Sequence, residues 1–199
     1  MYKCRTLGVA TLLAMSVTTQ AVTYDVAVGY ETSAISGVVG KAVENNHSGL
    51  IYKAPKFDLG LNSGINGPLS AFARVSTTMA SEQSSFAPGI SLESSREVQA
   101  QAGFAYKFGA TVVSFAPVVS IADYTVSSND VSETVGLQGL GLSSSVDIDL
   151  DRVGVRFHTQ YIMNNRVDHW ADSVSELNDM VGGLGTNVTK VGVCVFGSK

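Results

Sequence analysis

The sequence has few charged residues, few cysteines and no excess of basic residues, and these shortages exclude classes of protein. Charged residues make up 15% of its 199 residues, and the 13 Lys and Arg do not outnumber the 17 Asp and Glu. Nucleic-acid binders rely on clustered cations, so this balance argues against that function. Hydrophobic residues reach 45%, which is too many for a disordered chain. The length and composition predict a single folded domain.

The first 21 residues have the three-part pattern of a secretory signal peptide. Lys3 and Arg5 precede an apolar stretch over residues 7–17, and Ala21 ends a small-residue cleavage motif. The stretch is shorter than the roughly 20 residues of a transmembrane helix, and no later segment is long enough either. We therefore expect removal of residues 1–21 and a mature domain over residues 22–199. Cys194 is then its single cysteine, so it has no intramolecular disulfide.

The mature sequence repeatedly alternates apolar and polar residues, with the period of a β-strand. In residues 22–30 every even position is Val or Tyr, while Asp25 lies on the other face. The same pattern recurs in seven further segments: residues 57–62, 69–77, 98–108, 111–124, 135–148, 153–161 and 189–196. These segments predict eight strands.

Three positions in or next to these segments predict local irregularities. Pro55 and Pro117 lack the N–H that a strand ladder uses, so we expect a bulge, an end or a register change at each. The apolar parity shifts within residues 135–148, which predicts a bulge near Gly139.

The connections between the predicted strands alternate between short and long. Residues 62–68, 109–110 and 147–152 are short, whereas residues 31–48, 79–93, 127–133 and 163–185 are longer and polar. This alternation is typical of an up-and-down barrel with tight turns at one end and loops at the other, as in outer-membrane proteins. Segments of about ten residues also suit a tilted strand that crosses a membrane.

Charged residues in the middle of the strands decide between a soluble and a membrane barrel. They lie opposite the apolar face, so in a membrane barrel they would point into the lumen and pair there. The predicted polar network of the lumen consists of Asp25, Asp58, Arg74, Lys107, Arg156 and His158, with Glu31 on the same face. The fold class predicted is all-β, an eight-stranded antiparallel up-and-down transmembrane β-barrel. A soluble periplasmic barrel that carries a ligand is the alternative architecture.

Four segments resemble the small bacterial outer-membrane β-barrels, namely the barrels similar to outer-membrane proteins A and X. Residues 135–142, 147–152 and 153–161 look like the sixth strand, a turn and the seventh strand of these barrels, and residues 24–30 look like the first strand. The resemblance covers the mature chain in pattern and implies a barrel without a periplasmic domain.

Histidines raise the question of catalysis. His158 invites comparison with membrane barrels that modify lipids with a His and a Ser, but the sequence pairs it with no nucleophile. His47, His169 and Trp170 fall in the first and last long connections and are candidates for contacts with a partner. We expect no catalytic site, no metal and no cofactor.

The sequence thus predicts a monomeric protein of the outer membrane. It would contact outer-membrane lipid and display its loops for adhesion, envelope integrity or partner recognition, through an extracellular ligand or a host surface and without nucleic acid. A lipid-modifying enzyme, a narrow pore and a soluble periplasmic ligand-binding barrel are the alternative functions.

Overall fold

The structure is a computed structural model that describes residues 22–36, 50–80, 84–87, 90–128, 131–151, 153–166 and 186–198. Its regular elements are strands: β1 (Val22–Ser36), β2 (Leu50–Asn66), β3 (Leu69–Ala80), β4 (Ser84–Ala87), β5 (Ile90–Phe108), β6 (Thr111–Ser128), β7 (Val131–Leu150), β8 (Val153–Arg166) and β9 (Thr186–Ser198). Over these ranges, no helix has the length and apolar character needed to cross a membrane.

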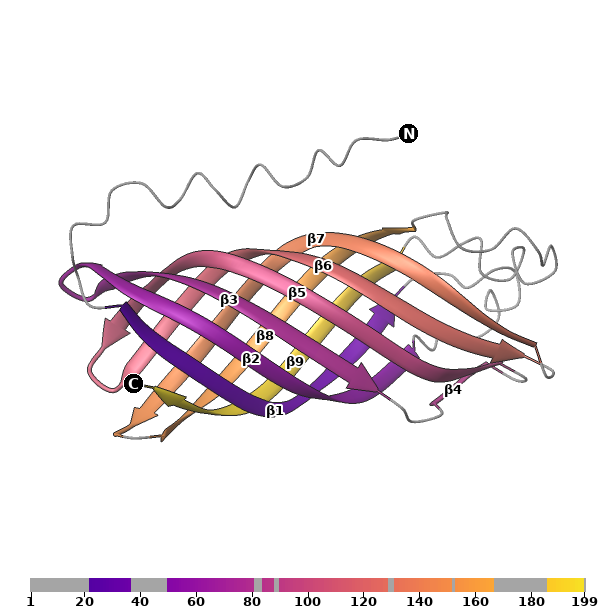
Figure 1. The fold of residues 1–199 in the computed structure, drawn as a ribbon, viewed down its shortest axis with the longest axis horizontal. Helices are drawn as coiled ribbons and strands as arrows, with labels where there is room; N and C mark the ends of the chain where they lie inside the picture. The colour runs from indigo at the N-terminus through magenta and orange to yellow at the C-terminus, as the bar shows by residue number, and fades with distance from the viewer. Residues whose placement is uncertain are drawn as a thin grey trace.

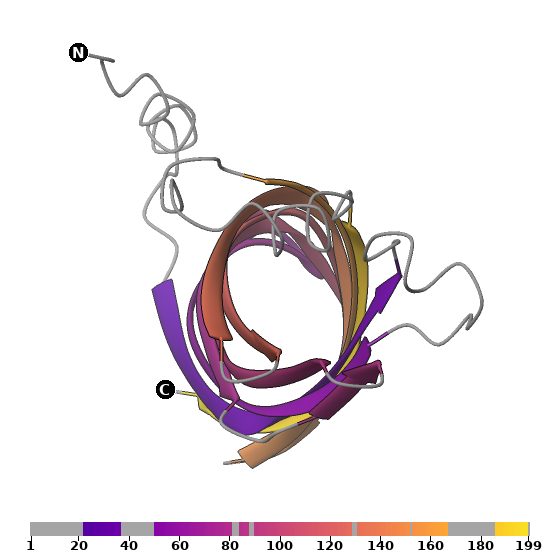
Figure 2. The ribbon, with the colours of Figure 1, turned by 90° about the vertical axis from the view of Figure 1, so that its right-hand side faces the viewer.

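The long strands pair antiparallel with their neighbours and close into a barrel (Figures 1 and 2). The order around the wall is β3-β2-β1-β9-β8-β7-β6-β5, and pairing of β3 with β5 completes the circle. The four-residue strand β4 pairs with the first residues of β5 and adds no position to the wall. The described residues therefore form an eight-stranded barrel, which confirms the predicted fold class.

Three tight turns join strands at one end of the barrel, as the sequence predicted. Gly67, Gly109 and Asp151 lie in the turns that follow β2, β5 and β7, with φ angles of 56°, 59° and 81°. Glycine adopts positive φ without a steric clash, and aspartate is one of the few other residues that tolerate it. The start of β1 and the end of β9 pair at this same end, where Asp25 lies opposite Ser198.

The strands extend further toward the other end than predicted. β6 continues to Ser128 and β7 begins at Val131, so the predicted long connection over residues 127–133 is wrong. The long strands have 12 to 20 residues, more than the 9–11 or so that cross the hydrocarbon layer. Beyond that layer both strand faces meet water, so the apolar alternation that marks a strand in the sequence fades.

The bulge predicted near Gly139 is wrong, because β7 keeps an unbroken register with β6 and with β8 through that residue. Leu137 simply points into the lumen, which explains the parity shift. At Pro117 the pairing of β6 with β5 is interrupted without a change of register. Pro55 remains paired with Tyr30 of β1, but the pairing of β2 with β3 ends one residue away, at Lys56.

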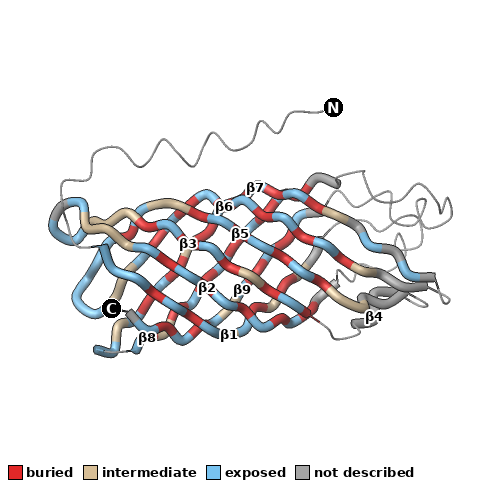
Figure 3. Tube along the Cα trace, in the orientation of Figure 1, coloured by how far each residue is buried: buried red, intermediate tan, exposed pale blue. Residues whose placement is uncertain are grey.

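The wall carries apolar side chains outward and charged side chains inward, and Figure 3 shows the resulting alternation along each strand. Val28, Leu59 and Val75 are 56%, 51% and 52% exposed, whereas Asp58 and Arg156 are each 1% exposed. This sorting is the reverse of that in a soluble barrel and matches a barrel surrounded by hydrocarbon. The structure is a transmembrane barrel and not a soluble carrier.

Replacing Leu59 with Arg tests this orientation of the wall. Leu59 lies midway along the outward apolar face of β2, so Leu59→Arg is expected to lower the free energy of unfolding in lipid vesicles by about 2–4 kcal/mol. Leu59→Ala controls for loss of the leucine side chain. Urea titration followed by gel mobility gives the two values. A change within about 0.5 kcal/mol, as expected at a water-exposed site, would contradict a hydrocarbon environment.

Candidate functional site

Inward-facing charged side chains form two clusters along the lumen. The turn-side cluster consists of Asp25, Asp58, Arg74, Asp147 and Arg156, and the loop-side cluster of Glu31, Lys56, Glu97, His158 and Lys190. Each of these residues is at most 8% exposed. The interior of an eight-stranded barrel is only wide enough for side chains, so the two clusters are packed within it.

Arg156 on β8 is the centre of the turn-side cluster. Its Nε donates to both carboxylate oxygens of Asp147 at 3.0 Å, and its Nη2 donates to Oδ2 of Asp147 at 2.8 Å and to Oδ2 of Asp25 at 3.2 Å. Its Nη1 lies 3.6 Å from Oδ2 of Asp58. The guanidinium also lies 5.0 Å from the ring centroid of Phe196. One side chain therefore links strands β1, β2, β7, β8 and β9.

Asp25 on β1 receives further donors from β2 and β3. Asn62 Nδ2 donates to its Oδ2 at 3.0 Å, and Arg74 Nη2 lies 3.8 Å from the same oxygen. Gly60 makes this position of the carboxylate available, because a Cβ there would lie 2.4 Å from Oδ1 of Asp25. The sequence thus has a glycine on β2 at the position over which the Asp25 carboxylate of the neighbouring strand β1 lies.

Glu31 on β1 is the centre of the loop-side cluster and is completely buried. Lys56 Nζ donates to its Oε2 at 2.9 Å, and Lys190 Nζ donates to its Oε1 at 2.9 Å. His158 Nε2 lies 3.0 Å from Oε2 of Glu31 and 3.2 Å from Lys56 Nζ. A Cβ at Gly192 would lie 2.3 Å from the His158 ring, so this glycine leaves room for the imidazole.

Lys190 also reaches across the lumen to Glu97 on β5, and its ammonium donates a hydrogen bond to the Glu97 carboxylate. The strand order places β9 and β5 four positions apart in either direction, so the two strands face each other across the barrel. Oε1 of Glu97 also accepts from Gln99 Nε2 at 2.8 Å and from Ser120 Oγ at 2.6 Å. This ion pair therefore spans the lumen between facing strands.

Two tyrosines contact each other in the loop-side part of the lumen. The hydroxyl oxygens of Tyr52 on β2 and Tyr124 on β6 are 3.2 Å apart. Their rings meet edge to face, with centroids 6.1 Å apart. Both residues are at most 5% exposed, so this pair adds an aromatic contact to the charged clusters that fill the lumen.

The chemistry of these groups is that of a structural network. His158 Nε2 is engaged by Glu31 and Lys56, and its Nδ1 is buried with no hydrogen-bond partner among the described residues, so no hydroxyl there contacts the imidazole. Ser145, its register partner on β7, hydrogen-bonds instead to Ser114 and Asp147. Among the described residues, no group of three or more His, Cys, Asp or Glu side chains is arranged to hold a metal.

Of the six predicted lumen residues, the structure places Asp25, Asp58, Arg74 and Arg156 in the turn-side cluster and His158 in the loop-side cluster. The assignment of Lys107 to this network is wrong. Lys107 has the inward parity but is exposed, because it lies beside the Gly109 turn, beyond the packed part of the lumen. The predicted contact residues His47, His169 and Trp170 lie outside the described residues.

Sequence reasoning missed four members of the network: Lys56, Glu97, Asp147 and Lys190. Asp147 was assigned to a turn, but β7 continues through Leu150. Lys56 and Lys190 lie near the ends of the predicted segments, where their parity was not followed. Lys190 has the opposite parity to the outward Val191 and Val193, and this signal was sufficient to place it in the lumen.

Comparisons with known proteins identify the fold. No protein-family profile matches the chain, and no curated protein matches it. The structure resembles Ail, the attachment invasion locus protein of Yersinia pestis, with a TM-score of 0.60 and 11% identity over 89% of this chain and 98% of Ail. Ail in complex with the heparin analogue sucrose octasulfate gives a TM-score of 0.58, again at 11% identity, over 89% and 99% of the two chains.

Neisserial surface protein A is also similar, with a TM-score of 0.55 and 11% identity over 87% of this chain and 96% of that protein. At such identities the likeness shows the fold. Together with the apolar outer wall and the ionic lumen, it shows that this chain has the fold of the β-barrels of the bacterial outer membrane.

A double-mutant cycle tests the ion pair across the lumen. Lys190→Met should lower the free energy of unfolding by about 3 kcal/mol, because it leaves the buried Glu97 carboxylate without its cation. Glu97→Gln should lower it by less, because Lys190 stays paired with Glu31. The double variant should lose clearly less than the sum, since neither charge remains. Lys107→Gln, at an exposed cation, is the control. Additive losses in urea titrations would refute the pairing.

Proposed function

We propose that this protein is a surface scaffold, a closed outer-membrane barrel that holds its loop end outside the cell for adhesion, envelope integrity or partner recognition. The carrying observation is the filled lumen, in which Arg156, Glu31 and Lys190 link strands on all sides. A wall with such a filling is a rigid support and not a conduit. We further propose that residues 1–21 are a signal peptide and that residues 22–199 form a monomeric barrel.

The two ends of the barrel differ as a display function requires. The turns after β2, β5 and β7 are tight, whereas residues 37–49 separate β1 from β2 and residues 167–185 separate β8 from β9. Outer-membrane barrels place short turns in the periplasm and long connections outside. The names of Ail, an attachment invasion protein, and of Neisserial surface protein A support the same class of role for this chain.

The charge of the longest connection indicates the chemistry of its partner. Residues 167–185 contain four acidic residues and no Lys or Arg: Asp168, Asp172, Glu176 and Asp179. Ail has been crystallised with a sulfated heparin analogue, but an acidic segment repels such a polyanion. We therefore propose a neutral or cationic partner that contacts His169 and Trp170, with His47 on the first connection.

The proposed role involves no catalysis. In the part of the chain that the structure describes, His158 is paired with Glu31 and Lys56, and the lumen around it is filled by other side chains. Substrate entry and an activated nucleophile are the two requirements of a lipid-modifying enzyme. Neither requirement is supported by this arrangement.

Loop exchange tests the display function. Residues 167–185 are replaced by a short Gly-Ser turn in cells that express the protein, and attachment to host-cell matrix is measured. Attachment should fall to the level of cells without the protein, while heat-modifiable gel mobility shows that the barrel still folds. Insertion of the same turn after Gly109, at the opposite end, is the control. Unchanged attachment after exchange of both residues 37–49 and 167–185 would refute adhesion as the role of the displayed loops.

Conductance across a planar bilayer tests whether the lumen is closed. The wild-type protein should show no stable openings, because side chains fill an eight-stranded barrel. The double variant Glu97→Ala and Lys190→Ala removes the cross-lumen pair without leaving an unpaired member of it, and should show ion-conducting events. Stable openings of the wild-type protein would contradict a plugged lumen and favour the pore.

A further inference from the structure

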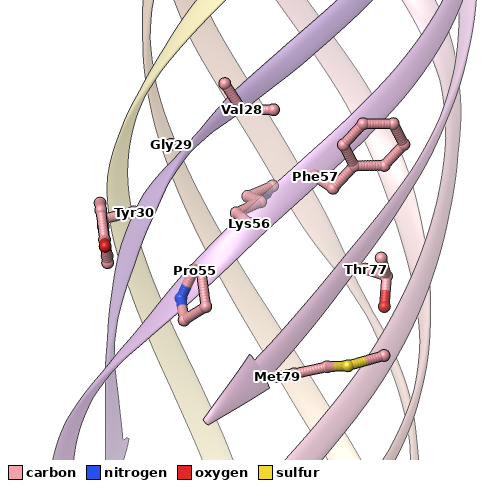
Figure 4. Close-up of a pocket in the computed structure, with 8 residues that line it drawn as sticks. All are labelled: Val28, Gly29, Tyr30, Pro55, Lys56, Phe57, Thr77 and Met79. Atoms are coloured by element: carbon pink, nitrogen blue, oxygen red, sulfur yellow. The ribbon is translucent and has the colours of Figure 1, made fainter.

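A groove crosses the outer wall of the barrel over strands β1, β2 and β3 (Figure 4). Its volume is about 560 Å³, and it is open along the outer surface. The side chains that line it include Val28, Tyr30, Pro55, Phe57, Thr77 and Met79. Most of these are apolar and exposed on the face of the barrel that meets hydrocarbon.

The groove lies where two neighbouring strands stop pairing. β2 pairs with β3 as far as Lys56 and Thr78, whereas its pairing with β1 continues through Pro55 to Leu50. Pro55 has no N–H and so cannot donate a ladder hydrogen bond. In Figure 4 the short Pro55 side chain lies between the longer side chains of Tyr30 and Met79. The outer surface is hollowed here because the pairing of β2 with β3 ends next to Pro55 and the side chain of this proline is short.

Two cations lie on the outward face at the loop end of this groove. Lys53 precedes Pro55 by two residues on β2, about 7 Å along the strand, and Arg96 of β5 lies opposite Met79 of β3. Both side chains are exposed, and the remaining exposed Lys or Arg whose side chain the structure describes, Lys107, is at the turn end. Asp123 of β6 faces Arg96 from the side away from the groove.

The geometry points to a binding site for the phosphorylated glycolipid of the outer leaflet, with an acyl chain in the groove and a phosphate at Lys53 and Arg96. An apolar channel within the membrane wall, with cations at its outer end, matches an amphiphile that has an anionic head and a hydrocarbon tail. The cations lie at the end that carries the long connections, which is the side of the outer leaflet.

A second copy of this chain is a poorer fit for the groove. Twofold pairing of two identical walls through this surface would bring Lys53 and Arg96 of one copy close to the same residues of the other. Four cations at one interface repel one another in the absence of a shared anion. The proposed lipid site is independent of the display function, since it uses the wall and none of the long connections.

Native mass spectrometry of the purified full-length protein tests the head-group contact. Lipid A and phosphatidylethanolamine are added separately, and bound lipid is counted. The wild type should retain lipid A at least tenfold better than phosphatidylethanolamine. The double variant Lys53→Gln and Arg96→Gln should lower the affinity for lipid A by about tenfold, because each cation near the surface contributes to anionic lipid binding. Lys107→Gln, which removes an exposed cation at the opposite end, should leave it unchanged.

A second pair of variants tests the groove itself. Thr77→Trp fills the hollow and should lower lipid A retention about tenfold, whereas Thr159→Trp, on the outward face of β8 across the barrel, should not. Heat-modifiable gel mobility confirms folding of each protein. Equal retention of the two lipids, or unchanged affinity in either the double variant or Thr77→Trp, would overturn the proposal. A dimer that Thr77→Trp dissociates would assign the groove to a second copy instead.

Discussion

Ion pairing across the lumen is the interaction on which the rest of this structure depends. Hydrocarbon surrounds the middle of the wall, so charged residues of that part of the strands have only the interior in which to lie, and an unpaired ion there costs several kcal/mol. Asp25, Glu31 and Glu97 each lie within ion-pair distance of at least one buried cation. Because these partners come from different strands, satisfying the charges also specifies which strands face one another.

The wall is adapted to this filling at individual positions. Gly60 and Gly192 lie where a Cβ would collide with the Asp25 carboxylate and the His158 ring. Large inward side chains therefore lie against glycines of the neighbouring strands. A narrow barrel can accommodate arginine, lysine and histidine together in this way. Phe196 points inward, on the strand face opposite to Val193 and Val195, and its ring lies under the Arg156 guanidinium.

The fold and most of the lumen network were predictable from the sequence, because a period of two assigns every strand residue to one of two faces. Parity placed Asp25, Asp58 and Arg156 correctly. It failed for Lys107, since parity gives the direction of a side chain and not its depth along the barrel. It also failed where both faces are polar, so the outer ends of β6 and β7 were taken for a connection. Pairing partners such as Lys190 and Glu97 depend on the register of strands that are far apart in the sequence.

A filled lumen restricts where this protein can act. With Arg156 and Lys190 linking strands around the interior, transport through the barrel and catalysis within it both require the network to be broken first. The remaining surfaces are the loop end, which the strands carry beyond the hydrocarbon layer, and the outer wall. These surfaces differ in what they meet: the loop end faces water, whereas the wall meets lipid along β1, β2 and β3. The rigidity that closes the interior is also what holds both outer surfaces in a constant shape, because neither can shift without separating ion pairs between the strands that form it.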